Sequence, residues 1–189
     1  MDAVQTGGKS PSPKKFLGTG LVIALIALVI DQIVKILVER NMRLGESIEV
    51  IPGIFNIHYI LNPGAAFSIG EDFTIIFALL QAAVAIFVIY LLARKVLVRS
   101  WAVALGSLLG GVLGNLGDRI FREPAFGFGH VVDMFSVTHF AIFNVADSFI
   151  VCSMIAVAYM LIRGRNLDGT IGDAPVKKNA GEDETESKK

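Results

Sequence analysis

Residues 143–162 read FNVADSFIVCSMIAVAYMLI, and this stretch decides the fold. Phe143-Asn144-Val145-Ala146-Asp147 stands at the mouth of an apolar run that continues through Ile162. The run predicts a membrane-spanning helix from about Phe140 to Ile162, with the carboxylate of Asp147 about six residues, or roughly 9 Å, inside it. Burying a carboxylate in hydrocarbon is costly, so an ionisable side chain at this depth indicates a functional site.

A second carboxylate precedes this span in the segment His130-Val131-Val132-Asp133. Two neighbouring carboxylates do not both ionise easily, so such a pair holds one proton near neutral pH. The ionised member can take a proton from water while the protonated member donates one to a carbonyl oxygen, which is peptide hydrolysis without a metal. Asp133 and Asp147 therefore predict an aspartic acid dyad. The alternative is that Asp147 caps a helix or forms an ion pair inside a bundle.

The composition is that of a polytopic membrane protein. The 189 residues are 53% hydrophobic, with a mean hydropathy of +0.63, and the charges fall in clusters between long uncharged runs. The formal net charge is zero, so no basic field indicates a nucleic-acid partner. A single cysteine, Cys152, excludes an intramolecular disulfide and a cysteine-based zinc site.

Four apolar segments predict four transmembrane helices, and they run from Phe16 to about Leu37, from Phe73 to Leu92, from Trp101 to Leu116 and from about Phe140 to Ile162. Lys14 and Lys15 before the first segment are typical of a signal peptide, but no small-residue cleavage site follows, which favours a retained helix. In the third segment, Gly106, Gly110 and Gly114 recur every four residues and predict a face for close helix packing.

The polar segments indicate one small folded element and two tails. Residues 47–51 alternate and residues 54–61 favour strand, which predicts a small extracytoplasmic sheet or hairpin on the membrane surface. It ends in the small-residue turn Asn62-Pro63-Gly64-Ala65-Ala66-Phe67. Residues 1–15 and 163–189 are predicted to be disordered cytoplasmic tails on either side of a membrane domain of residues 16–162.

Basic residues near the spans set the orientation. Eight lie on one side, against four on the other: Lys9, Lys14, Lys15, Arg94, Lys95, Arg99, Arg163 and Arg165 against Arg40, Arg43, Arg119 and Arg122. Both termini are therefore expected in the cytoplasm. With four spans, the unusual polar residues then all fall at the outer membrane face: Asp31, Lys35, Asn62, Asn115, Arg119, Asp133, Asn144 and Asp147.

The supporting polar residues allow more than one interpretation. Asp31 and Lys35 are spaced i, i+4 and predict an ion pair that either braces the site or snorkels to the headgroups. Asn144 precedes Asp147 by three residues on the same helix face, where its amide can orient a carboxylate or a substrate carbonyl. Arg119 can anchor a carboxylate or a lipid phosphate, or can act as a structural tether.

Other chemistries have weaker support in the sequence. His130 and His139 lie near acidic residues, but no HExxH or comparable metal-binding spacing is present. Ser107 lies in the middle of the third span without a histidine or lysine at matching depth, so a packing role is favoured over a nucleophile. An ion-coupled transporter would need polar residues in the inner half of the spans. The sequence offers almost none there apart from Gln81 and small hydroxyl side chains. A structural assembly factor leaves the outward polar cluster unexplained.

Five sequence blocks resemble those of lipoprotein signal peptidase, also called signal peptidase II, in their order along residues 31–147. One of them alone would be weak, but together they are specific, and none departs from the family pattern. The blocks are Asp31-Gln32-Ile33-Val34-Lys35, Asn62-Pro63-Gly64-Ala65-Ala66-Phe67, Gly110-Gly111-Val112-Leu113-Gly114-Asn115-Leu116-Gly117-Asp118-Arg119, Gly129-His130-Val131-Val132-Asp133 and Phe143-Asn144-Val145-Ala146-Asp147.

The resemblance implies an aspartyl endopeptidase of the bacterial cytoplasmic membrane, with Asp133 and Asp147 as the catalytic pair and no metal or other cofactor. It implies prolipoprotein substrates that carry diacylglycerol on the cysteine after the cut, inhibition by globomycin-like compounds, contact with membrane lipid, and a monomer. Further motif positions are implied around the substrate or inhibitor: Asp31, Lys35, Asn62, Gly64, Asn115, Arg119, Asn144 and Ala146.

Overall fold

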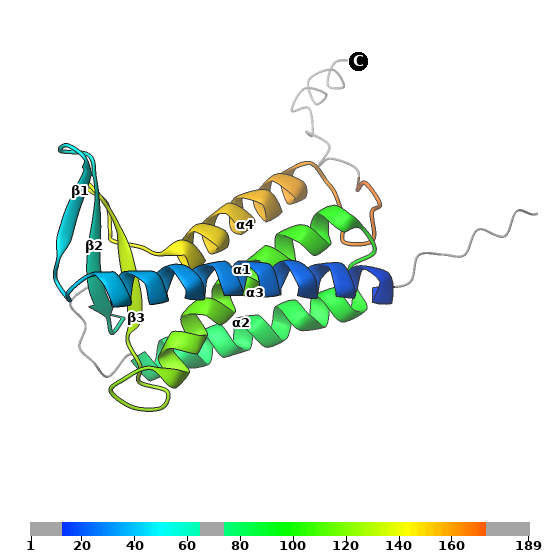
Figure 1. The fold of residues 1–189 in the computed structure, drawn as a ribbon. Helices are drawn as coiled ribbons and strands as arrows, with labels where there is room; N and C mark the ends of the chain where they lie inside the picture. The colour runs from blue at the N-terminus through cyan, green and yellow to red at the C-terminus, as the bar shows by residue number, and fades with distance from the viewer. Residues whose placement is uncertain (1–12, 65–73, 173–189) are drawn as a thin grey trace, which may run out of the picture.

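The computed structural model describes residues 13–64 and 74–172, and it shows a bundle of helices with a small sheet at one end (Figure 1). The elements in chain order are α1 (Pro13–Asn41), β1 (Ser47–Ile51), β2 (Phe55–Asn62), α2 (Thr74–Arg94), α3 (Arg99–Phe121), β3 (Val131–Val137) and α4 (Val145–Ile162). Four helices are long and apolar enough to cross a membrane: Phe16–Asn41, Thr74–Arg94, Arg99–Phe121 and Val145–Ile162. The predicted architecture, four transmembrane helices with a small β-rich element, is confirmed.

Helix α3 is the centre of the bundle and packs against α1, α2 and α4. In its most apolar window 72% of residues are buried, against 17–22% in the other three helices. The outer helices instead turn large apolar side chains outward, where they suit hydrocarbon: Leu25, Leu79 and Ile155 are 60%, 64% and 64% exposed. A membrane-spanning bundle explains this exposure, because lipid is the solvent of these faces.

Small residues allow α1 to lie against α3, as the glycine spacing predicts. A Cβ added to Gly106 would lie 2.4 Å from the carbonyl oxygen of Gly20, and one added to Gly110 would lie 2.5 Å from that of Ala24. Neither helix can carry a larger side chain at these contacts without moving apart.

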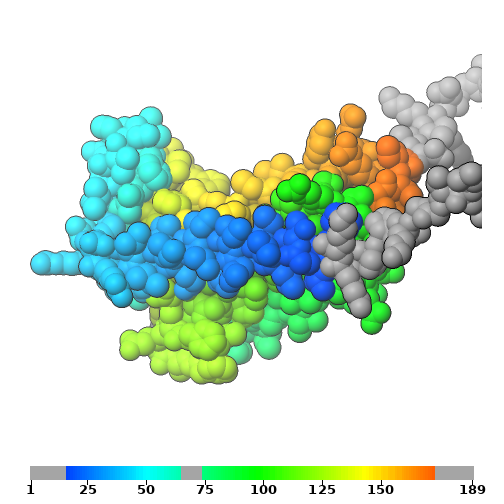
Figure 2. Space-filling view, turned by 45° about the vertical axis from the view of Figure 1, so that its right-hand side comes forward, coloured from blue at the N-terminus to red at the C-terminus, as the bar shows by residue number. Residues whose placement is uncertain are grey.

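The sheet is antiparallel, in the order β1-β2-β3, and it lies at one end of the bundle against the last turns of α1 (Figures 1 and 2). The register pairs Ile60 with Asp133 and Asn62 with Val131. The first two strands confirm the predicted hairpin, whereas β3 was not predicted. Asp133 therefore lies on a strand that is held by β2, and not on a loop.

Two predicted helix boundaries are wrong. Helix α3 continues five residues beyond Leu116, because its polar residues are paired inside the bundle. Helix α4 begins at Val145 and not near Phe140, because residue Phe143 bridges to Phe135 beside the sheet. Asp147 thus lies in the first turn of α4 and not six residues inside a span.

The first and last membrane spans begin at Phe16 and end at Ile162, while ordered structure continues a few residues beyond each of these positions. Helix α1 already begins at Pro13, within the segment expected to be a tail. Residues 163–172 form a turn in which Arg165 bridges to Ile171, because the Asp168 carboxylate accepts hydrogen bonds from Thr170. The rest of the two predicted tails, and residues 65–67 of the predicted turn, lie outside the described residues.

Candidate active site

Asp133 lies near one end of the bundle on β3 and is 1% exposed. Its Oδ2 accepts a hydrogen bond from Nδ2 of Asn62 at 2.8 Å, and its Oδ1 accepts one from Nδ2 of Asn144 at 2.7 Å. Burial first, and the charge of Asp147 in addition, raise the pKa of this carboxyl to about 6 against the lowering effect of the two amides. Asp133 is therefore the kind of carboxyl that holds a proton near neutral pH.

Asp147 is the third residue of α4, and it forms a capping box with Asn144. The backbone N–H of Asp147 donates to Oδ1 of Asn144 at 2.9 Å, and the backbone N–H of Asn144 donates to Oδ2 of Asp147 at 3.1 Å. Oδ1 of Asp147 accepts from Nδ2 of Asn115 at 2.7 Å. The capping role that was left as an alternative is thus real. It coexists with a partly exposed carboxylate at a helix N-terminus, where negative charge is favoured.

Asn144 joins the two carboxylates, since its side-chain amide donates to Asp133 and its backbone N–H donates to Asp147. The same amide also donates to Oδ1 of Asn115 at 3.0 Å. Asn144 and Asn115 are 0% and 4% exposed, so these bonds form away from bulk water. The arrangement fixes both carboxylates at one place although β3 and α4 carry them separately.

Lys35 is fully buried, and it is connected to the Asp133–Asp147 pair through Asn115. Its ammonium lies 2.8 Å from Asp31, 2.7 Å from Asp118 and 3.0 Å from Oδ1 of Asn115. The predicted ion pair of Asp31 and Lys35 is confirmed, and its burial favours the bracing role over snorkelling. Three acceptors use the three donors of the ammonium, so the group is fixed in position.

Two further members of this network were missed as site residues, Asp118 and Gln32. Asp118 is 1% exposed and accepts from Nε of Arg122 at 2.7 Å as well as pairing with Lys35. Nε2 of Gln32 donates to both Asp31 and Asp118. The available signal was position: Asp118 follows Asn115 by three residues on α3, so the two share a face.

Ala146 and Gly64 take their places through backbone contacts. The N–H of Ala146 donates to Oδ1 of Asp31 at 2.8 Å, and the fully buried methyl group lies where a Cβ on Gly114 would approach it to 3.2 Å. Gly64 has a φ of +107°, and its N–H donates to Oδ1 of Asn62 at 2.8 Å. This bond orients the Asn62 amide that serves Asp133.

Arg119 is 6% exposed, and its guanidinium lies 5.7 Å from the centre of the Phe77 ring. Within the described residues, Nε and Nη1 have no hydrogen-bond partner. The carboxylates of Asp133 and Asp147 are close enough to act on its charge. The structure therefore brings every predicted site residue to one end of the bundle, while their roles in a reaction stay predictions.

The histidines do not join this cluster in a metal-binding arrangement. Among the described residues, no three His, Cys, Asp or Glu side chains are grouped so that they could hold a metal ion. His139, with a φ of +62°, lies in the turn after β3.

Comparison with known proteins identifies the family. Residues 23–163 match the family model described as signal peptidase (SPase) II. The chain is 50% identical over 149 residues to lipoprotein signal peptidase of Streptomyces coelicolor, covering 79% of this chain and 72% of that protein. It is 45% identical over 165 residues to the protein of the same name from Leifsonia xyli subsp. xyli, covering 85% and 76%.

Two solved structures have the same fold, and both are described as bacterial membrane enzymes determined by the in meso method. One, at 1.9 Å resolution, is 30% identical, covers 77% of this chain and 94% of its own, and superposes with a TM-score of 0.69. The other, at 2.3 Å resolution, is 28% identical, covers 90% and 95%, and gives a TM-score of 0.67. The chain belongs to the signal peptidase II family of membrane proteases.

Proposed function

We propose that this protein is an aspartyl endopeptidase that removes signal peptides from prolipoproteins, cutting before a cysteine that carries diacylglycerol. The single observation behind the proposal is that one residue, Asn144, donates to a carboxylate oxygen of Asp133 at 2.7 Å and of Asp147 at 3.1 Å. The two acids are thus held together at the end of a membrane-spanning bundle. A pair of this kind needs no third group to activate water.

The different surroundings of the two acids favour different roles. Asp133 is buried and has its pKa raised to about 6, so it serves as the protonated member that donates to the scissile carbonyl oxygen. Asp147 is partly exposed and accepts from the backbone N–H of Asn144, so it is the member that can meet water and serve as its base. As the carbon–nitrogen bond breaks, the leaving amine takes the proton that Asp147 removed from water, and the hydroxyl that becomes the new carbonyl returns its proton to Asp133.

The amides and Lys35 act as positioning groups. Asn62 and Asn144 hold both oxygens of Asp133, while Asn115 holds Asp147 and receives a bond from Lys35. This order matters because catalysis needs the two carboxylates fixed toward one water molecule and one carbonyl.

The substrate is proposed to reach the pair from the membrane at its outer face. A signal peptide enters the bilayer with its N-terminus in the cytoplasm, so its cleavage site arrives near that face. The peptide must unwind to be cut, which hydrocarbon tolerates only where hydrogen-bond partners are supplied. β1 is an edge strand, and the turn at Asn62 and Gly64 lies beside Asp133, so both are suited to pair with an extended peptide. Globomycin-like inhibitors are proposed to bind at the same site. The enzyme is proposed to act as a monomer.

The first prediction tests the pair directly. Asp133→Asn and Asp147→Asn should each reduce cleavage of a diacylglyceryl-modified precursor by at least about a hundredfold, because each removes one proton donor or acceptor. The measurement is precursor turnover by the purified chain, with an unlipidated precursor as the substrate control. Asp168→Asn, which changes an exposed acid of the turn after α4, should cleave at the wild-type rate. Undiminished cleavage by either dyad variant would remove that residue from the reaction, and equal cleavage of both precursors would remove the lipid from the proposed specificity.

A further inference from the structure

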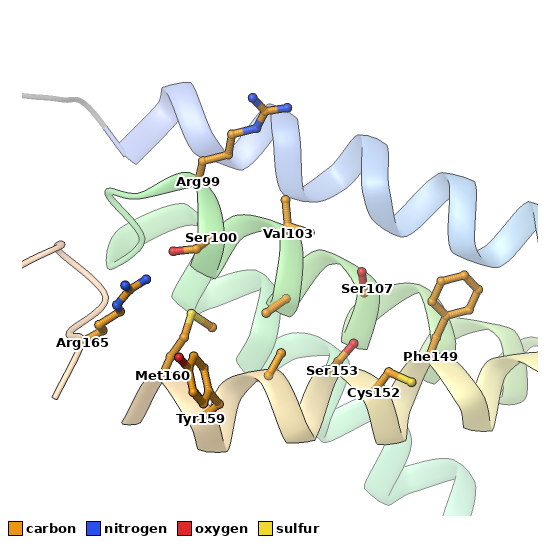
Figure 3. A pocket seen from close by; sticks show the side chains of 12 residues that line it. Arg99, Ser100, Val103, Ser107, Phe149, Cys152, Ser153, Tyr159, Met160 and Arg165 are labelled. Atoms are coloured by element: carbon orange, nitrogen blue, oxygen red, sulfur yellow. The ribbon is translucent and has the colours of Figure 1, made fainter. Parts of the chain in front are cut away.

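A groove lies between α3 and α4; on α4 it begins at Phe149, two residues after Asp147, and it extends away from the Asp133–Asp147 pair. Its volume is about 710 Å³. Along α4 it extends from Phe149 to Met160, which is roughly 16 Å at the helical rise. Figure 3 shows Ser107 of α3 and Ser153 of α4 facing each other across it, with larger side chains toward its ends. The small residues in the middle create the hollow.

The groove opens sideways to the surroundings of the bundle. Two of its lining residues, Val103 and Tyr159, are 38% and 57% exposed, and Cys152 is exposed as well. In a membrane-spanning bundle this side faces lipid. The long apolar part of the groove is therefore open to a hydrocarbon chain from the bilayer.

Positive charge lies at the end of the groove farthest from the acid pair. Arg99, Ser100 and Arg165 line that end. Figure 3 shows the Arg165 guanidinium and the Ser100 hydroxyl directed toward each other, and the Arg99 guanidinium directed toward α1. Both arginines are exposed, and neither forms an ion pair within the described residues. Within residues 94–103 and 160–172, the acidic residue is Asp168, whose Oδ1 is engaged by Thr170.

We propose that this groove binds an anionic phospholipid of the leaflet opposite the acid pair, with an acyl chain between α3 and α4, the phosphate at Arg165 and Ser100, and the exposed Arg99 adding positive charge at the same end. Guanidinium groups pair with phosphate oxygens through two parallel hydrogen bonds, and a serine hydroxyl adds a donor. The apolar hollow and the charged end thus match the two parts of one molecule.

Two other occupants fit the groove less well. The helix of a signal peptide begins with basic residues, which the two arginines would repel. A helix of about 10 Å diameter would also displace roughly 1,300 Å³ over this length, more than the groove provides. A second copy of the chain would bring its own Arg99 and Arg165 to the same end, and like charges would meet.

The test is a lipid titration of the purified full chain, followed by native mass spectrometry. The probes are phosphatidylglycerol and phosphatidylcholine with identical acyl chains. Wild type should bind its first phosphatidylglycerol more tightly than phosphatidylcholine. Arg99→Gln and Arg165→Gln should each weaken phosphatidylglycerol binding about fivefold, and together should remove the preference. Ser107→Leu, which fills the hollow, should weaken binding of both lipids.

The matched control is the double variant Arg94→Gln and Lys95→Gln, which removes two charges at the same end without touching the groove. It should keep the preference of wild type. Equal binding of the two lipids by wild type would overturn the proposal, as would a control variant that loses as much as Arg99→Gln with Arg165→Gln. A synthetic signal peptide that displaces the lipid from wild type would assign the groove to the substrate instead. Thermal unfolding of each variant shows that it is folded before its affinity is compared.

Discussion

At the scale of single residues, the site is defined by how each carboxylate oxygen is engaged. Both oxygens of Asp133 accept from side-chain amides, while Asp147 accepts from one amide and one backbone N–H. In the proposed pair, either acid could hold the shared proton if only the chemistry of two carboxyl groups were considered. Burial distinguishes them, because Asp133 is 1% exposed and Asp147 is partly exposed.

The pKa of Asp133 makes a prediction about stability. Its folded-state pKa is raised to about 6, first by burial, so between its ordinary value of 3.8 and about 6 the folded protein holds a proton that the unfolded chain has lost. The stability from this proton is complete below about pH 3.8 and is lost as pH rises through about 6, for a loss on the order of 3 kcal/mol. Thermal unfolding in detergent should show that the stability of the wild type falls from pH 4 to 7 by more than the stability of Asp133→Asn does. Parallel curves for the two proteins would contradict the assignment.

At the scale of elements, α3 organises the molecule by giving each partner helix a suitable face. Its glycines meet the backbone of α1, and its polar end meets Lys35 and Asp31 of the same helix. The close approach of α1 and α3 is therefore also what places Lys35 beneath Asn115. The packing of α1 on α3 and the geometry of the candidate site therefore depend on the same helix–helix contact.

This dependence predicts opposite effects for two glycines of α3. A Cβ at Gly110 would lie 2.5 Å from the Ala24 carbonyl oxygen and 2.6 Å from the Ala27 Cβ, whereas one at Gly117 meets nothing within 4 Å. Gly110→Ala should lower the free energy of unfolding by about 1–3 kcal/mol, because α1 must move away. Gly117→Ala should leave it unchanged or raise it by up to about 1 kcal/mol, because alanine favours helix. Thermal unfolding of both variants in one detergent is the measurement, and equal losses would refute the packing argument.

At the scale of the whole molecule, the helices run alternately toward and away from the sheet (Figure 1). The acid pair lies at the sheet end, while α1 begins and α4 ends at the other. The basic residues Arg94, Lys95, Arg99, Arg163 and Arg165 follow or precede helix ends away from the sheet. This excess of positive charge predicts that the end away from the sheet lies in the cytoplasm.

The orientation can be measured with reporter fusions. Fusions after Arg99 and after Arg165 should report the cytoplasm, and a fusion near Gly127, in the loop between α3 and β3, should report the outer side. A cytoplasmic signal at Gly127 would place the acid pair on the wrong face for an emerging signal peptide.

The sequence by itself determined the four membrane spans and the gathering of the polar residues at one end. Both follow from local information: a span is a continuous apolar run, and its direction alternates with the one before. The ion pair of Asp31 and Lys35 was equally predictable, because i, i+4 spacing fixes it within one helix. The five motif blocks carried the family, which the comparisons confirm, and they predict the acid pair.

The tertiary structure alone decided how these residues meet. β3 exists because β2 offers it an edge, and Asn62 reaches Asp133 across 71 residues of sequence. The pairing of Lys35 with Asp118 joins α1 to α3 and appears in no local pattern. The start of α4 moved to Val145 because Phe143 is held beside Phe135 and Asn144 closes the capping box. Hydropathy shows how far apolar sequence continues, but a helix begins where its first N–H groups find acceptors, and here the folded chain supplies them.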